Sequence, residues 1–339
     1  MTPTDAVSRT APQPLISLVV PCFNESEVIA QTHSRLVALA QRLTRITTES
    51  GSTPAKETML ELIYVNDGSH DSTLECLLAF HAAATPGIHV RVISFSRNFG
   101  HQAAIAAGLM HSKGQWIATI DADLQDPPEL VLDMLQLART QGYDVVHGKR
   151  NTREGETVFK RLTAFLFYRL LNVLSRGRAL NDVGDFRLMS QRVVSAINRL
   201  PERSLYLRGL LPELGYPQMT MLYERPPRAA GETKYTLSKM MALAFEGITA
   251  VSVSPLKMGL ALGALTALAC VIYLASILVH LVINPDFAVR GWPSLMAVIL
   301  FLGAVQLISI GILGEYVGQI HREVKHRPRF FINDEQSRL

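Results

Sequence analysis

One stretch of the sequence, IDADLQDPPEL at residues 120–130, places three carboxylates directly after a run that reads as a buried strand. Asp121, Asp123 and Asp126 follow the sequence GQWIATI, and Gln125 adds a neutral oxygen between the last two. Side chains at positions i and i+2 of a strand share one face, so Asp121 and Asp123 are expected to point the same way at the strand's carboxyl end. Clustered oxygen ligands suit a hard divalent cation, Mg2+ or Mn2+, that is shared with substrate phosphates. The alternative, from these residues alone, is a solvated acidic loop between a strand and a helix.

The surrounding elements predict the sheet that has to position these side chains. Strands are predicted at residues 15–23, 59–69, 89–99, 114–124 and 143–150, and helices at 26–43, 71–83, 100–112 and 127–141. Strands that alternate with helices indicate a mostly parallel α/β sheet with helices on both faces, in which ligands lie at the carboxyl ends of the strands. Polar residues fall at several of these ends, namely Asn24, Glu25, Asn66, Asp67, Asp121 and Asp123.

Hydrophobic residues make up 48% of the 339-residue chain, and many of them lie in two uncharged runs. Residues 258–283 and 292–314 contain no Asp, Glu, Lys or Arg. Each run exceeds the roughly 20 residues that a transmembrane helix needs. We predict a hairpin of two transmembrane helices, at 255–283 and 292–318, preceded by an amphipathic interfacial helix at 236–254.

The charges that flank the two runs predict their orientation. The connecting loop NPDFAVRG has one basic residue, whereas four follow the second run: Arg322, Lys325, Arg327 and Arg329. The positive-inside rule therefore predicts a multi-pass protein of the cytoplasmic (inner) membrane, with its catalytic domain and a tail at 319–339 in the cytoplasm. The first 14 residues are polar, are predicted to be disordered, and contain no apolar signal region. Three widely separated cysteines (Cys22, Cys76 and Cys270) fit a reducing compartment and argue against a zinc site or a disulfide framework.

Six short stretches, which follow one another along the chain, together resemble the motifs of a known family: VVPCFNE, VNDGSHDST, SRNFGHQAA, DADLQDPPE, VGDFRLMS and RAAGETKY. Together they resemble glycosyltransferase family 2, and within it the polyprenyl-phosphate glycosyltransferases of the bactoprenol glucosyltransferase and dolichyl-phosphate mannose synthase type. The resemblance covers about residues 15–330. It implies a Rossmann-like GT-A catalytic domain at 15–235 that uses a nucleotide diphosphate sugar and a divalent metal, Mg2+ or Mn2+. No GxGxxG sequence follows the first strand, which argues against a dinucleotide-dependent dehydrogenase.

The resemblance assigns donor-side roles residue by residue. Asp123 and Gln125 look like the metal ligands, and Asp121 like a nucleotide or donor-sugar contact. The base and ribose pocket would be lined by Pro21, Asn24 and Glu25, with Asp67 meeting the uracil or ribose. Arg228 and Lys234 match a loop that closes over the donor diphosphate. Asn98 and His101 look like loop residues near the donor sugar, although a turn-stabilising role for His101 is an equal alternative, and Asn66–Gly68 could be an ordinary strand-ending turn.

The acceptor side is assigned in the same way. Arg150 and Arg161 resemble contacts to the acceptor phosphate, and they lie in the basic stretch 149–178, whose alternative is a solvated helix face. Asp185 resembles a residue near the acceptor that is often proposed as a base, with Asp182 as a weaker neighbour. A strong base is not required, because a phosphate acceptor is already anionic near neutral pH and can attack the sugar C1 directly. Positioning and electrostatics would then supply most of the rate.

The predicted activity is that of an inverting glycosyltransferase. It would move a hexose, with UDP-glucose as the favoured donor, to undecaprenyl or another polyprenyl phosphate at the cytoplasmic membrane face. The resemblance also suggests a homotetramer, and no nucleic acid is expected as a partner. The sugar and the choice between uridine and guanosine stay open. Two alternatives are a processive polysaccharide synthase, which calls for a QxxRW-type motif and more spans, and a non-catalytic membrane scaffold that binds nucleotides, against which the intact DADLQ and GDFRLM sequences argue.

Overall fold

A computed structural model describes residues 14–49, 60–83, 85–150, 183–202, 207–224, 254–283 and 291–339. The chain divides into two compact units. The first comprises residues 1–161, 180–234 and 328–339 and contains the sheet, and the second comprises 162–179 and 235–327 and contains two long helices.

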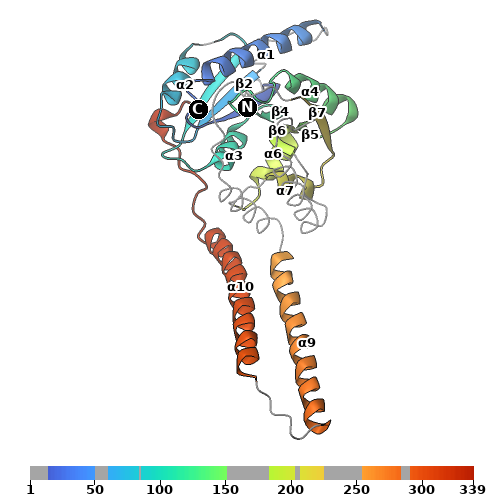
Figure 1. Ribbon diagram of the computed structural model, residues 1–339. Helices are drawn as coiled ribbons and strands as arrows, with labels where there is room; N and C mark the ends of the chain where they lie inside the picture. Colours follow the sequence, from blue (N-terminus) through green and yellow to red (C-terminus); the bar gives the residue numbers. More distant parts are fainter. Residues whose placement is uncertain are drawn as a thin grey trace, which may run out of the picture. The chain divides into compact units, whose positions relative to one another are not determined.

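The sheet of the first unit has seven strands among the described residues, in the order β3-β2-β1-β4-β6-β5-β7 (Figure 1). The strands are β1 (Ile16–Cys22), β2 (Leu60–Asn66), β3 (Ile88–Ser94), β4 (Trp116–Thr119), β5 (Val145–Arg150), β6 (Val183–Ser190) and β7 (Gln218–Tyr223). The first four strands are parallel to their neighbours among themselves, and β5 is parallel to β7. The carboxyl ends of β1, β2, β3 and β4 therefore meet at one edge, as predicted for a site of this fold class.

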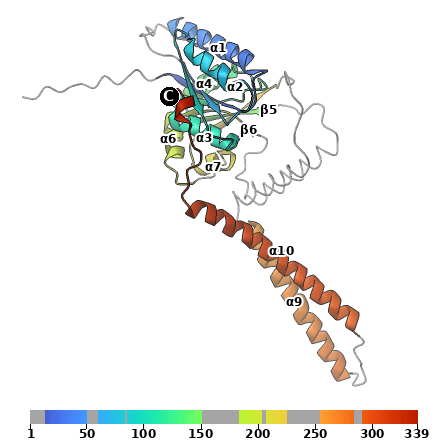
Figure 2. The same ribbon diagram turned by 90° about the vertical axis from the view of Figure 1, so that its left-hand side faces the viewer.

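Helices cover both faces of the sheet, which confirms the predicted α/β architecture (Figure 2). One face packs against α1 (Ile29–Glu49), α2 (Thr73–Ala82) and α4 (Leu130–Gln141), and the other against α3 (His101–His111), α6 (Gln191–Asn198) and α7 (Leu207–Glu213). Successive side chains of a strand point to opposite faces of the sheet. In β1, Leu18 and Val20 therefore pack on the side of α1, α2 and α4, and Val19 packs on the side of α3, α6 and α7. Gly108 lets α3 approach β1 closely, because a Cβ at this position would lie 2.1 Å from Cγ1 of Val19.

The strand β6 was not predicted, and it inserts antiparallel between β4 and β5. Its first residues therefore lie at the edge where β4 ends, with Thr119 of β4 opposite Arg187 of β6. The Thr119 hydroxyl donates a hydrogen bond to the backbone carbonyl of Asp185. This antiparallel strand brings Asp185 to the carboxyl edge of the parallel strands.

The second unit contains α9 (Ser254–Ile283) and α10 (Trp292–Val324). Residues 301–321 of α10 are long and apolar enough to cross a membrane, with a mean hydropathy of 1.5 and none of the most apolar window buried. Charged residues are scarce in both helices, and apolar side chains such as Leu265, Val271 and Phe301 are exposed. Long apolar helices with exposed apolar side chains are typical of membrane-associated segments.

Candidate active site

The loops that follow β1 and β2 are bonded to one another at the carboxyl edge of the sheet. The N–H of Asn24 donates to Oγ of Ser69 (3.0 Å), and Oδ1 of Asn24 accepts the N–H of His70 (2.8 Å). The N–H of Glu25 donates to Oγ1 of Thr73, the first residue of α2 (2.9 Å). Asn24 has a left-handed φ of 56°, a conformation that asparagine adopts more readily than most residues. The two predicted nucleotide residues of the first loop are thus fixed against the second loop.

Asp67 is buried at the end of β2 and holds the loop that follows β3. Its Oδ1 accepts the N–H of Phe99 (2.6 Å), and its Oδ2 accepts the N–H of Gly100 (3.0 Å). Burial raises the pKa of Asp67, although these two hydrogen bonds act to lower it. Gly68 allows the close approach of the loop, because it has a φ of 66° and a Cβ there would lie 2.4 Å from the carbonyl carbon of Arg97. Each Asp67 oxygen keeps a second lone pair that a ligand could use.

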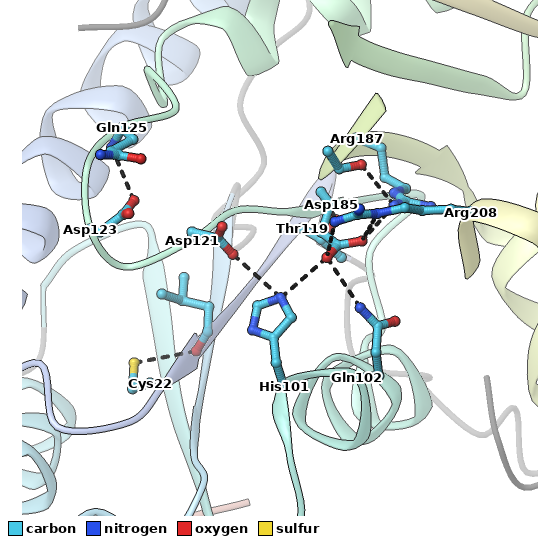
Figure 3. A network of polar contacts seen from close by, with 12 residues as sticks. Cys22, His101, Gln102, Thr119, Asp121, Asp123, Gln125, Asp185, Arg187 and Arg208 are labelled. Carbon is cyan, nitrogen blue, oxygen red and sulfur yellow. Dashed lines mark hydrogen bonds and ion pairs between the residues drawn. The ribbon is translucent and has the colours of Figure 1, made fainter. Parts of the chain in front are cut away.

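The loop after β4 separates the two aspartates of the DAD sequence. Since β4 ends two residues before Asp121, the prediction that Asp121 and Asp123 share a strand face is wrong. Figure 3 shows Asp121 directed toward His101, and Asp123 beside Gln125. The N–H of Gln125 donates to Oδ1 of Asp123 (3.1 Å), and Leu124 between them has a left-handed φ of 57°. A bulky residue in this conformation is strained, which is a feature typical of functional loops.

Asp123 and Gln125 present oxygen atoms of the type that a hard divalent cation binds. Gln125 is 5% exposed, and its Oε1 has no hydrogen-bond partner among the described residues. A buried amide oxygen without a donor is costly unless a ligand supplies the partner. Within the described part of the chain, no group of three His, Cys, Asp or Glu side chains is placed to hold a metal alone. The pair therefore fits a cation that is bound together with substrate phosphates, which is the usual arrangement for Mg2+.

Asp185 lies at the centre of a polar cluster (Figure 3). Its Oδ1 accepts a hydrogen bond from Nη2 of Arg187 (2.8 Å). Its Oδ2 accepts bonds from Nη2 of Arg208 (3.1 Å) and Nε2 of Gln102 (3.1 Å), and lies 3.4 Å from Nε2 of His101. The Arg187 side chain is fully buried, so Asp185 is its compensating charge in the interior.

These partners keep Asp185 ionised. Burial acts to raise its pKa, but the hydrogen bond from His101 and the charges of Arg187 and Arg208 hold the pKa well below its usual range. A carboxylate of this kind has little affinity for a proton, so it is a poor general base at neutral pH. The negative charge of Asp185 instead positions Arg208 and His101, and both of these side chains are partly exposed.

His101 begins α3 and lies between two carboxylates. Its Nε2 is 3.6 Å from Oδ1 of Asp121 and 3.4 Å from Oδ2 of Asp185. Burial acts to lower the pKa of His101, but the hydrogen bond to Asp185 and the two negative charges raise it. Burial raises the pKa of Asp121 to about 6, with His101 acting to lower it and the aspartates nearby, including Asp126, acting to raise it. Because the His101 ring lies close to both carboxylates, these contacts favour a role in the active site over a role in stabilising the turn.

Some of the remaining predicted residues lie within the described ranges and others lie outside them. Pro21 is buried on β1 opposite Val65 of β2, and Arg150 ends β5 opposite Tyr223 of β7. The carbonyl oxygen of Asn98 accepts a bond from Arg97 (3.0 Å). Four predicted residues lie outside the described ranges: Arg161, Asp182, Arg228 and Lys234.

Three members of the Asp185 cluster were not predicted from the sequence: Gln102, Arg187 and Arg208. Arg187 follows Asp185 by two positions on a strand, so the alternation of side chains could have identified it. Gln102 follows His101 on the first turn of α3. Arg208 lies on the short helix α7, and no local pattern connects it to Asp185.

Comparisons with known proteins identify the family. Residues 17–197 match the model of glycosyl transferase family 2, and residues 254–320 match the GtrB C-terminal hairpin. A bactoprenol glucosyl transferase of Shigella phage SfV is 41% identical over 325 residues, which cover 95% of this chain and 99% of that protein. The uncharacterized glycosyltransferase YkcC of Bacillus subtilis is 41% identical over 316 residues, which cover 93% of this chain and 92% of that protein.

Among solved structures, the chain is similar to glucosyl-3-phosphoglycerate synthase from Mycobacterium tuberculosis, in complex with Mn2+, UDP-glucose and phosphoglyceric acid. It is 19% identical, has a TM-score of 0.46, and is matched over 70% of this chain and 78% of its own. The family match covers strands β1 to β6 and the loops that follow β1 to β4, and the curated relatives align over nearly the whole chain. The protein is therefore a glycosyltransferase with a GT-A catalytic domain and a C-terminal helical hairpin, and it belongs to glycosyl transferase family 2.

Proposed function

We propose that the protein transfers a hexose, glucose from UDP-glucose, to undecaprenyl phosphate or a related polyprenyl phosphate, with inversion at C1. The observation that carries this proposal is the oxygen pair of Asp123 and Gln125. It lies on the same sheet edge as the loops of Asn24 and Asp67. The name of the phage relative supports a polyprenyl acceptor and glucose as the sugar.

The donor is held by the residues of the β1, β2 and β4 loops. Asn24, Glu25 and Asp67 contact the nucleoside, while Asp123 and Gln125 would hold a divalent cation, Mg2+ or Mn2+, beside the diphosphate. When bound, such a cation neutralises charge on the diphosphate leaving group. Asp121, on the same loop, is assigned to the donor sugar, and its Oδ1 lies 3.6 Å from Nε2 of His101.

The acceptor phosphate attacks C1 directly. One of its oxygens forms the new bond to C1 as the bond between C1 and the diphosphate oxygen breaks, and UDP leaves. No proton has to be removed, because the attacking oxygen is already anionic. This agrees with the depressed pKa of Asp185. Arg208 and His101, fixed by Asp185, supply positive charge at this edge, and Arg150 and Arg161 are assigned to the acceptor phosphate.

The test of this function is transfer of labelled sugar into a lipid phase. The purified full chain is given undecaprenyl phosphate, Mg2+ or Mn2+, and one of UDP-glucose, UDP-galactose, UDP-N-acetylglucosamine or GDP-mannose. We expect the label from UDP-glucose to enter the lipid fastest, and chelation of the metal to stop it. Failure of every donor to label the lipid, or label in a water-soluble polymer, would exclude the proposal.

We also propose that the hairpin spans the cytoplasmic membrane and that the catalytic domain faces the cytoplasm. In a background without the native cysteines, Phe287→Cys in the hairpin loop should react with an impermeant thiol reagent added to intact cells. Glu335→Cys, an exposed position, should react only after the membrane is opened. The reverse pattern would place the site away from cytosolic nucleotide sugars and contradict the function.

The basic residues are expected to divide between the two phosphates. Arg161→Ala should weaken use of the lipid phosphate, and Arg228→Ala should weaken nucleotide-sugar binding in the absence of lipid. The loss of one charge-assisted contact should cost about 1.5–3 kcal/mol, or roughly ten- to a hundredfold. Calorimetry with UDP-glucose and kinetics at varied lipid concentration separate the two, and Arg139→Ala on the exposed side of α4 is the matched control. Equal loss of donor binding in both variants would remove the acceptor assignment of Arg161.

A further inference from the structure

Residues 328–339, here called the edge segment, belong to the first unit and pack against β3, the strand at one edge of its sheet. Val92 and Arg338 exchange two backbone hydrogen bonds (3.0 and 2.7 Å). The carbonyl oxygen of Ser94 accepts the N–H of Asn333 (2.7 Å), and the N–H of Ser94 donates to Oγ of Ser337 (3.0 Å). An edge strand otherwise leaves such groups open to water or to other chains. The edge segment therefore completes the sheet on this side.

The edge segment continues along the loop that follows β3. The N–H of Ser96 donates to the carbonyl oxygen of Phe331 (3.0 Å). The ring of Phe330 stacks on that of Phe95, with centroids 4.8 Å apart and an angle of 15° between the planes. Phe95 is 2% exposed and contacts Phe99 edge to face at 5.7 Å. Aromatic pairs of this kind favour a fixed orientation of the rings.

Those contacts lead directly to the donor-side residues. Phe99 and the following Gly100 are the two residues whose N–H groups bind the Asp67 carboxylate. A second route runs through Ser94, whose hydroxyl donates to Oε1 of Gln336 (3.3 Å) and accepts from Nδ2 of Asn66 (3.0 Å). The edge segment thus contacts residues that support Asn66 and Asp67.

We propose that the edge segment is a positioning element of the donor site. It orders the 95–100 loop, and through the N–H groups of Phe99 and Gly100 it sets the orientation of Asp67. The inference rests on the proposed function for the identity of the ligand, the uridine diphosphate part of the donor. Its residues act through Asp67 and the loop, so they are expected to affect donor affinity and not acceptor use.

Two neighbouring proline substitutions separate this role from a general effect on folding. Asn333→Pro removes the N–H that donates a hydrogen bond to the carbonyl oxygen of Ser94. The φ of Asn333, −90°, is close to the value that proline requires. Asp334→Pro places the same ring at the first position of a short 3-10 helix, where proline fits and where, in the described structure, no bond to β3 is lost. A third variant lacks residues 328–339 and keeps both helices of the hairpin.

The experiment measures UDP binding by calorimetry without lipid, and amide hydrogen exchange of Phe99 and Gly100, in the full membrane protein. We expect Asn333→Pro to weaken UDP binding about three- to tenfold, which is the effect of one net hydrogen bond, and the deletion to weaken it more. Exchange at Phe99 and Gly100 should accelerate in the same order. Asp334→Pro should match the wild type, and the KM for the lipid phosphate should stay unchanged in both proline variants.

Unchanged exchange at Phe99 and Gly100 in the deletion variant would overturn the proposal. So would faster exchange with unchanged UDP binding, because the loop would then be ordered without consequence for the donor. If the wild-type protein itself does not bind UDP, the proposed donor is wrong. The exchange measurement then still decides whether the edge segment orders the Asp67 loop.

Discussion

Asp123→Asn is expected to reduce transfer to the lipid by on the order of a hundredfold or more while the fold stays intact. The substitution removes one negative charge from the oxygen pair that fits a divalent cation, and such a cation is worth several kcal/mol of charge stabilisation in the transition state. The side chain is partly exposed, and an asparagine can still accept the N–H of Gln125. The free energy of unfolding should therefore change by less than about 1 kcal/mol.

Turnover at limiting Mg2+ or Mn2+, measured beside a denaturation curve, checks this prediction. Asp133→Asn is the matched control, because Asp133 is an exposed aspartate on α4, ten positions along the chain. It should keep wild-type turnover and the wild-type dependence on metal concentration. If Asp123→Asn does the same, the assignment of Asp123 as a metal ligand is wrong.

Asp185→Asn is expected to lower the free energy of unfolding by about 3–5 kcal/mol. It should also lower the rate of sugar transfer. The substitution leaves the fully buried Arg187 without its compensating charge, and an uncompensated buried charge is costly. Because the pKa of Asp185 is lower in the folded than in the unfolded protein, its contribution to stability is fully present above the unfolded pKa of about 4. That contribution is lost as the pH falls below this value.

Chemical denaturation at several pH values tests this account of Asp185. The stability difference between wild type and Asp185→Asn should be constant near neutral pH and shrink below about pH 4. Asp144→Asn is the control: Asp144 is also buried, but its partner Arg192 is 64% exposed and can be hydrated, so the loss should be smaller. A variant Asp185→Asn with wild-type stability, together with a wild-type rate that rises with pH through a single ionisation near neutrality, would indicate a general base.

The parallel half of the fold could be predicted from the sequence because its signals are local. Strands β1 and β2 are short apolar runs that end in polar turns, and the helices α1 and α2 that follow them keep an apolar face. The positions of Asn24 and Asp67 at one edge follow from parallel strand order alone. The uncharged length of residues 258–283 and 292–314 likewise predicts the hairpin without any tertiary contact.

The environment of Asp185 could not be predicted in this way, because it depends on long-range pairing. Its strand β6 runs antiparallel between β4 and β5, and Arg208 reaches it from a separate helix. The short β4 also ends before the DAD sequence, so Asp121 and Asp123 are not strand residues and the rule that alternate residues share a face does not apply to them. The edge segment is a similar case, since Arg338 pairs with Val92 far along the chain.

The mass and anomeric configuration of the lipid product made from UDP-glucose test the central claim most directly. Direct attack by an acceptor phosphate on the α-linked donor predicts a polyprenyl phosphate that carries one hexose in the β configuration. Mass spectrometry gives the number of sugars, and NMR of the purified lipid gives the anomer. An α-linked product would contradict a single displacement at C1, and a lipid with several hexoses, or free glucose without a lipid product, would contradict the proposed transfer.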